Sequence, residues 1–212
     1  MLEPRILDGA SQADAGIIDR FRKTSTSIIS DNLSRLPGAN GLRPFHRVDG
    51  AMAGTAFTVR VAAGDNYTIH KALDLLRPGD VLVVDGGGDT ERALVGEIMA
   101  TLARTRGAAG LVIDGAVRDT GALARMDFPC FARAANHRGP YKNGPGEINV
   151  PVSIGGLVIQ PGDIVVGDED GVVAFPQAIA EELLVAVNLQ EKKEADIIQS
   201  ILAGTYTGAY AK

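Results

Sequence analysis

Residues 77–119, RPGDVLVVDGGGDTERALVGEIMATLARTRGAAGLVIDGAVRD, decide which fold this chain can adopt. The runs VLVVD at 81–85 and GLVID at 110–114 are continuously apolar, as expected of strands buried on both faces of a sheet. Between them lies a segment of helical pattern that closes near Gly107, and glycine favours the position just past a helix end. Strand, helix and strand in this order predict an α/β domain.

The alternation of helical and extended patterns continues on both sides of this stretch. The turn at Arg77-Pro78-Gly79-Asp80 ends the preceding helix, because proline cannot continue it. The elements expected elsewhere are helices at 12–22, 25–36, 66–76 and 117–126, a strand at 53–62, short strands and turns over 129–175, a long C-terminal helix at about 176–203, and a loose tail at 204–212. A chain of 212 residues without a linker-like segment predicts one domain, residues 1–212.

Composition and charge exclude several classes of function. The net charge of -5 and the aromatic content of 5% argue against a nucleic-acid partner, which needs basic and stacking side chains. No apolar run approaches the ~20 residues that span a bilayer, so no membrane association is expected. The N-terminus lacks the pattern of a secretory signal, and Cys130 is the one cysteine. We therefore expect a cytoplasmic protein.

Familiar catalytic and nucleotide-binding motifs are missing from the sequence. The segment GGGDTERALVG does not have the spacing of a dinucleotide-binding loop, and a phosphate-loop lysine is absent. His46, His70 and His137 lie far apart and show no metal-ligand spacing; His70 is interpreted as a residue on a helix face. Cys130 lies in the segment FPCFA at 128–132, close to two Phe residues, and is interpreted as a small buried hydrophobic residue.

Acidic residues and glycines gather where the two apolar strands end. Asp85 is followed by three glycines and Asp89, and Asp114 ends the second strand. Ligands of open α/β sheets collect outside these strand ends. The glycines would leave backbone amides unshielded and allow a ligand to approach closely.

Gly96 allows two interpretations of the helix between the strands. A helix from Thr90 to Arg106 would carry Gly96 in its interior at a cost of roughly 1 kcal/mol relative to alanine. A helix that begins at Gly96 would instead present the free N–H groups of Gly96, Glu97, Ile98 and Met99 to a carboxylate or phosphate. A glycine that serves only helix packing remains the alternative.

Arg118 and Asp119 follow the second strand across an expected tight turn at Gly115-Ala116. A neighbouring Arg and Asp often mark only a solvated helix start. At this position, however, an arginine can bind a carboxylate or enolate through its planar fork. An aspartate is a hard oxygen ligand suited to Mg²⁺, which needs only one or two protein carboxylates. Together with the N–H groups near Gly96, the pair would bind a metal-chelated 2-oxo acid.

The run ALVGEIMATLARTRGAAGLVIDGAVRD at 93–119 resembles the central segment of the RraA-like family. The catalytic branch of that family comprises 4-hydroxy-4-methyl-2-oxoglutarate / 4-carboxy-4-hydroxy-2-oxoadipate aldolases, which carry an acidic residue, twenty intervening residues and then Arg-Asp. Glu97 and the pair Arg118-Asp119 have this spacing. Weaker similarity covers STSIISDNL, PGDVLVVDGGG and the C-terminal segment KEADI. The chain departs from the pattern at Glu97, where the characterised aldolases tend to have Asp.

The resemblance implies a layered α/β sandwich similar to the swivelling phosphohistidine domain, assembled as homotrimers or homohexamers with sites between subunits. It implies that the backbone of Gly96 through Met99 holds the substrate carboxylate and that Arg118 contacts the substrate. It further implies that Asp119 is the direct protein ligand of Mg²⁺ or Mn²⁺. Glu194, in KEADI, is expected to reach the site of a neighbouring subunit, where it and Glu97 take part in catalysis.

The function implied is a divalent-metal-dependent carbon–carbon lyase that releases pyruvate from a 4-hydroxy-2-oxo acid, with oxaloacetate decarboxylation as a side activity through the same enolate. The alternative is a non-catalytic, protein-binding regulator of ribonuclease activity, the role of the family's namesake. The presence of both Arg118 and Asp119 favours the enzyme.

Overall fold

The two apolar runs that opened the sequence analysis lie side by side and parallel at the centre of a ten-stranded sheet. β4 (Asp80–Asp85) pairs with β6 (Gly110–Val117) in a register that sets Val83 opposite Val112. The sheet has the order β1-β8-β3-β4-β6-β7-β2, with β11 and β12 joined to β3 and β5 joined to β6. This computed structural model describes residues 3–35, 38–47 and 51–208. The predicted α/β class is confirmed.

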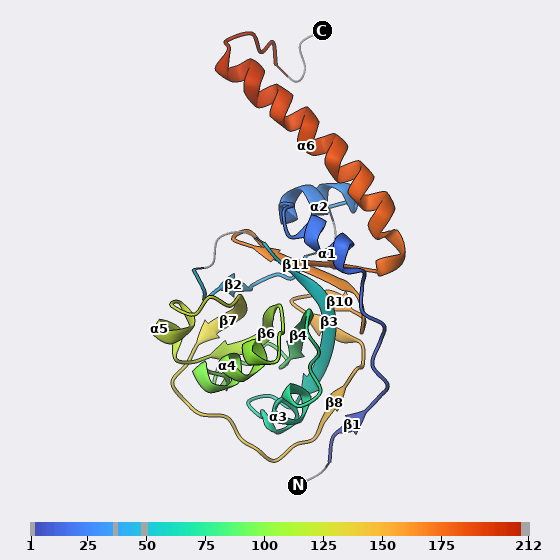
Figure 1. The fold of residues 1–212 in the computed structure, drawn as a ribbon. Coiled ribbons are helices and arrows are strands. Elements are labelled where there is room, and N and C mark those ends of the chain that lie inside the picture. Colours follow the sequence, from blue (N-terminus) through green and yellow to red (C-terminus); the bar gives the residue numbers. More distant parts are fainter. Residues whose placement is uncertain (1–2, 36–37, 48–50, 209–212) are drawn as a thin grey trace.

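Helices cover one face of the central strands and one end of the sheet, and the long C-terminal helix extends beyond the body (Figure 1). The helices are α1 (Ala15–Phe21), α2 (Thr26–Asn32), α3 (Tyr67–Leu73), α4 (Glu97–Thr105), α5 (Thr120–Leu123) and α6 (Ala180–Leu202), with a short 3₁₀ turn at Gln177–Ile179. The other strands are β1 (Arg5–Ile6), β2 (Arg43–Pro44), β3 (Met52–Val61), β5 (Ala93–Val95), β7 (Cys130–Ala135), β8 (Gly146–Ile148), β9 (Val152–Ile154), β10 (Leu157–Ile159), β11 (Ile164–Asp168) and β12 (Gly171–Phe175).

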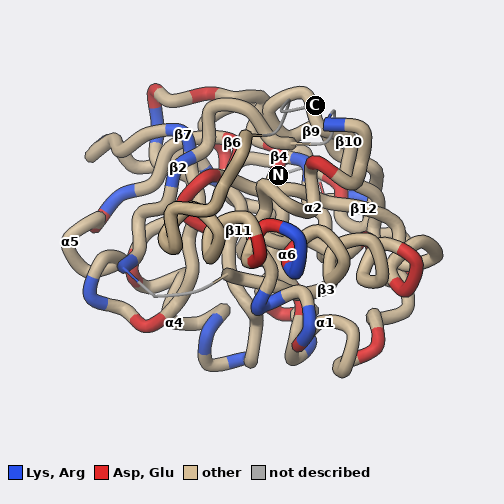
Figure 2. The backbone as a smooth tube through the Cα atoms, turned by 90° about the horizontal axis from the view of Figure 1, so that it is seen from above, with Lys and Arg blue, Asp and Glu red and all other residues tan. Residues whose placement is uncertain are grey.

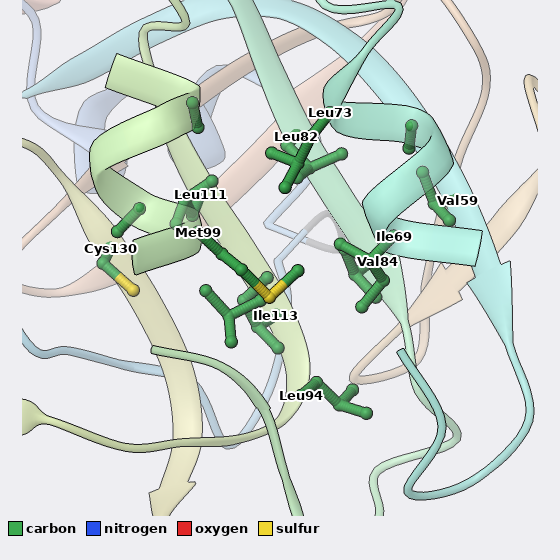
Figure 3. Packing of buried hydrophobic residues seen from close by; sticks show 14 of the residues in the cluster. Val59, Ile69, Leu73, Leu82, Val84, Leu94, Met99, Leu111, Ile113 and Cys130 are labelled. Carbon is green, nitrogen blue, oxygen red and sulfur yellow. The ribbon is translucent and has the colours of Figure 1, made fainter. Parts of the chain in front are cut away.

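The central strands are continuously apolar at residues 81–84 and 111–113 because both of their faces are covered there. Successive strand residues point to opposite faces. Leu82 therefore joins a cluster beneath α3 and α4, whereas Val83 joins a second cluster with Phe131 and the strands that follow β8. Figure 3 shows the first cluster, in which Met99 of α4 reaches down to Ile113 of β6. This packing anchors the start of α4 against the sheet.

The prediction was wrong at the end of β6, where the candidate site lies. β6 continues to Val117, so Gly115-Ala116 is not a tight turn but part of the strand, within a register shift against β7. The helix expected at 117–126 is reduced to the four residues of α5. The strand continues because β5, which was not predicted, pairs with it at Ala116 and Val117. Such pairing between distant segments leaves no local pattern in the sequence.

Several other elements are shorter than expected, for local reasons. α1 begins at Ala15 because Asp14 caps it, accepting a hydrogen bond from the N–H of Ile17. α2 ends at Asn32, and Ser34 and Arg35 then have positive φ; residue 36, the last of the predicted helix, lies outside the described residues. The predicted C-terminal helix is present as the 3₁₀ turn followed by α6, whereas residues 209–212 of the tail are not described.

Charged residues of both signs are interspersed along the chain when the molecule is viewed from above (Figure 2). α6, seen nearly end-on in this view, carries acidic and basic residues close together. Among the described residues, no helix combines the length and the apolar character that a membrane span requires.

Candidate active site

The start of α4 decides between the two interpretations of Gly96. The helix begins at Glu97 with Gly96 as its N-cap, and residues 93–95 form β5 rather than a first helical turn. The prediction of a helix that begins at Gly96 is therefore confirmed. The N–H of Glu97 donates to Oδ2 of Asp119 over 3.0 Å. Within the described residues, the N–H groups of Gly96, Ile98 and Met99 have no protein acceptor. These N–H groups can therefore bind an anion.

Asp119 occupies a strained position directly opposite this helix start. Its backbone is left-handed, with φ 57° and ψ 37°, a conformation that aspartate adopts more readily than most residues but that still costs roughly 1 kcal/mol. The turn is tied to β5, because the N–H of Arg118 donates to the carbonyl of Val95 over 3.0 Å. The Arg118 and Asp119 side chains are 44% and 42% exposed, with 3.7 Å between Nε and Oδ2. Both therefore remain accessible to a ligand.

Gly96 is required by this close approach rather than by its backbone angles. Its φ of -143° is ordinary extended backbone. A Cβ at this position would lie 2.5 Å from Oδ2 of Asp119 and 2.9 Å from Cγ of Arg118. The glycine thus lets the Arg118-Asp119 turn contact the first amide of α4.

Two pockets meet at Arg118 and Asp119. The smaller, about 240 Å³, is lined by β5, the start of α4, Asn66 and His70 near α3, and Pro140 and Lys142. The larger, about 520 Å³, is lined by Glu91, Thr120 and residues 135–138. The carboxylate of Asp119 is half-exposed at the wall that the two pockets share. A hard oxygen donor with room for water around it fits Mg²⁺, which retains several waters when bound to protein.

The comparison with known families follows the same residues. The family described as RraA-like, Aldolase/RraA, matches residues 26–174. This range includes Arg118, Asp119 and all the other residues that line the two pockets. The chain belongs to the RraA-like family. A relative from Halalkalibacterium halodurans, named "Putative 4-hydroxy-4-methyl-2-oxoglutarate aldolase", is 42% identical over 187 residues, covering 88% of this chain and 87% of that protein.

Solved structures of other proteins share the fold. An uncharacterized protein from Pseudomonas syringae pv. tomato is 29% identical with a TM-score of 0.79, covering 92% of this chain and 96% of that one. The RNA-processing inhibitor RraA from Thermus thermophilis is 35% identical with a TM-score of 0.66, covering 73% of this chain and 93% of that one.

This RraA-like protein brings together six of the seven site residues expected from the sequence. These are Gly96, Glu97, Ile98, Met99, Arg118 and Asp119. Glu194 lies on α6, accepting a hydrogen bond from Gln190 over 2.8 Å, and lines neither pocket of its own chain. In Figure 1, this part of α6 extends away from α4 and α5.

Asn66, His70 and Lys142 were missed as residues of this site. Asn66 is 3% exposed; its Nδ2 donates to the carbonyl of Leu94 over 2.9 Å, and its Oδ1 has no hydrogen-bond partner in the described part of the chain. His70, interpreted from the sequence as a helix-face residue, lies on the pocket wall, where burial and then the charge of Lys142 lower its pKa. The signal available was an Asn before a helix, followed four residues later by His, but the pocket that they line also needs β5 and the start of α4, which lie far away in the sequence.

The glycine-rich loop after β4 was assigned an open amide surface, and this interpretation was wrong. The N–H of Gly87 donates to Asp85 over 3.0 Å, and the N–H of Gly88 donates to the carbonyl of Asp114 over 3.1 Å. Asp114 is 4% exposed and pairs with Arg133. These two N–H groups are therefore already bonded to acceptors on β4 and β6 and offer little to a ligand.

Cys130 and His46 form a structural pair at the far edge of the sheet. Cys130 is fully buried, and burial raises the pKa of its thiol to about 12, in line with the predicted small hydrophobic role. The N–H of Cys130 donates to Nδ1 of His46 over 3.0 Å, and burial lowers the pKa of this imidazole. Among the described residues, no three His, Cys, Asp or Glu side chains cluster as a metal site.

Proposed function

We propose that this protein is a divalent-metal-dependent lyase that cleaves a 4-hydroxy-2-oxo acid to pyruvate and a second oxo acid. The observation that carries the proposal is the contact between Arg118-Asp119 and the start of α4, made possible by Gly96. It brings together the guanidinium of Arg118, the carboxylate of Asp119 and three N–H groups that have no acceptor within the described ranges. The name of the Halalkalibacterium halodurans relative supports the same reaction class.

Each of these groups has a role in binding a 2-oxo acid. The N–H groups of Gly96, Ile98 and Met99, at the positive end of the α4 dipole, bind the substrate carboxylate. Asp119 would hold Mg²⁺ or Mn²⁺, and its bond to the N–H of Glu97 keeps the carboxylate oriented. When bound, the metal supplies Lewis-acid polarisation of the 2-oxo group. Arg118 stabilises the negative charge that develops on the same oxygen.

The reaction requires a proton to leave the 4-hydroxyl group. As it leaves, the C3–C4 bond breaks, its electron pair forms the pyruvate enolate, and C4 becomes a carbonyl; protonation at C3 then gives pyruvate. We assign the proton transfer to carboxylates at the rim: Glu97, and Glu194 of a neighbouring subunit in a homotrimer or homohexamer. Decarboxylation of oxaloacetate passes through the same enolate, so it is the expected side activity.

A regulatory role is the second candidate, supported by the similarity to the RNA-processing inhibitor RraA from Thermus thermophilis. Such a role would act through protein contact and would not need a carboxylate and a guanidinium held in a strained turn beside unpaired amides. The retention of both Arg118 and Asp119 in this geometry favours the lyase.

Pyruvate release from a panel of 4-hydroxy-2-oxo acids and oxaloacetate tests the proposal. We expect turnover with Mg²⁺ or Mn²⁺, loss of turnover in EDTA, and recovery when metal is returned. Light scattering on the same sample should show a trimer or a larger assembly. Activity that persists in EDTA would contradict metal dependence, and inactivity on the whole panel would contradict the lyase. A monomer of 22.1 kDa that is fully active would contradict the role of Glu194.

A further inference from the structure

Residues 136–143 form a segment, here named the strap, that crosses the candidate site between β7 and β8. Asn136, His137 and Arg138 line the larger pocket, while Pro140 and Lys142 line the smaller one. Between them, Gly139 backs the guanidinium of Arg118, since a Cβ at this glycine would lie 3.4 Å from Nη1. The strap is therefore one wall of both pockets.

We propose that Arg92 is a positioning residue that fixes the middle of the strap and thereby shapes both pockets around Arg118; this inference rests on the proposed lyase function. Arg92 itself lines neither pocket. Its Nη1 donates to the carbonyl of Gly139 and its Nη2 to the hydroxyl of Tyr141, each over 2.8 Å. Its guanidinium also lies over the Tyr141 ring, 4.0 Å from the centroid.

The ends of the strap have other attachments, so the contribution of Arg92 is confined to the middle. At one end, Nδ2 of Asn136 donates to the carbonyls of Thr90 and Glu91 over 2.8 and 2.9 Å. At the other end, the backbone of Tyr141 bonds to Gly64 and Asn66 over 2.8 and 3.0 Å, and the N–H of Asn143 donates to Asp65 over 2.6 Å, so Arg92 adds the attachment of the Gly139 carbonyl and the Tyr141 side chain. Arg92 lies in the connection between β4 and β5, and its side chain donates hydrogen bonds to the Gly139 carbonyl and the Tyr141 hydroxyl.

An arginine suits this position because it serves two acceptors and an aromatic face at the same time. Its planar fork reaches the Gly139 carbonyl and the Tyr141 hydroxyl while its face stacks on the ring. In the part of the chain that the structure describes, no carboxylate forms an ion pair with Arg92. The interactions found for its guanidinium are therefore those with Gly139 and Tyr141 of the strap.

The test compares Arg92→Ala, Arg92→Lys and Tyr141→Phe with the wild-type protein. Amide hydrogen exchange of residues 136–143 should accelerate most in Arg92→Ala, less in Arg92→Lys and least in Tyr141→Phe, which keeps the ring. A wall displaced by about 1 Å can cost up to about 10²-fold, so we expect kcat/KM to fall by about tenfold to 10²-fold in Arg92→Ala. The loss should appear largely in KM and be greater for a six-carbon 4-hydroxy-2-oxo acid than for the four-carbon oxaloacetate.

Arg106→Ala is the matched control, because Arg106 also donates from a surface position, to Asp74 over 2.7 Å, and does not contact the strap. It should leave strap exchange and kinetics unchanged. Unchanged strap exchange in Arg92→Ala would overturn the inference, as would faster exchange with wild-type kinetic constants. If the wild-type protein were inactive, the lyase proposal would fail by itself. Calorimetric binding of pyruvate with Mg²⁺ would then replace the kinetic readout, and equal affinity in wild type and Arg92→Ala would overturn the positioning role.

Discussion

Asp114 and Asp119 lie five positions apart on the same stretch of chain, yet the fold uses them in opposite ways. Asp114 is buried at 4% exposure within β6, pairs with Arg133 through its side chain, and accepts the N–H of Gly88 at its carbonyl. Asp119 is half-exposed, sits in a left-handed turn and accepts the N–H of Glu97, beside three N–H groups that have no acceptor among the described residues. An acidic residue at a strand end therefore supports structure when its partners are internal, and is available for chemistry when they are not.

Asp119→Asn should produce the largest effect on the functional side of this comparison. The substitution keeps the shape, tolerates the positive φ and can still accept from the N–H of Glu97. It removes the charge that would hold Mg²⁺, a contribution of several kcal/mol to the transition state. We expect Mg²⁺-dependent pyruvate release to fall by about 10³-fold. Wild-type turnover in a folded variant would contradict the assignment of Asp119 as the metal ligand.

Arg118→Lys should follow, because an ammonium cannot reproduce the planar fork of the guanidinium. Loss of a charge-assisted contact to the enolate costs about 10²–10³-fold in rate. Aldol cleavage and oxaloacetate decarboxylation should decline together, since they share this enolate, while the melting temperature changes little. A variant that loses one activity and retains the other at wild-type level would exclude a common enolate step.

Gly96→Ala tests the contact between the start of α4 and the Arg118-Asp119 turn. The backbone of Gly96 accommodates alanine, but the new Cβ would displace the Asp119 carboxylate and the Arg118 side chain, which are flexible. We expect a folded protein whose kcat/KM is lower by about 10²-fold. Gly121→Ala is the control, because Gly121 lies in α5 near the same turn, with its nearest neighbour 3.5 Å from the added Cβ. Equal activity in both variants would show that the close approach at Gly96 is dispensable.

Asp114→Asn should have the smallest effect on catalysis and act on stability instead. Weakening the charged hydrogen bond to Arg133, whose side chain is 27% exposed, should lower the free energy of unfolding by about 2 kcal/mol. Urea unfolding measures this change, and activity per folded molecule should remain near the wild-type value. A loss of turnover as large as that of Asp119→Asn, without loss of stability, would erase the distinction between the two aspartates.

Much of the scaffold could be predicted because its signals are local. The apolar runs of β4 and β6, the N-cap at Gly96 and the closing Gly107, which has φ +83°, were all identified correctly. The end of β6 could not be, because it depends on pairing with β5 and β7 rather than on its own residues. The same limit applies to the smaller pocket, whose Asn66 and Lys142 come from segments 76 positions apart.

The sequence by itself determined the α/β class, the order of the central elements and the pairing of Arg118-Asp119 with the start of α4. These properties follow from periodicity, glycine placement and motif spacing, which act over a few residues or one strand–helix–strand unit. Only the tertiary structure decided which polar groups are already satisfied. The N–H groups of Gly87 and Gly88 after β4 are bonded to Asp85 and Asp114, while three at the start of α4 have no protein acceptor among the described residues. Hydrogen bonding and burial depend on which distant segments pack together, so residue type alone cannot separate a structural aspartate from a candidate metal ligand.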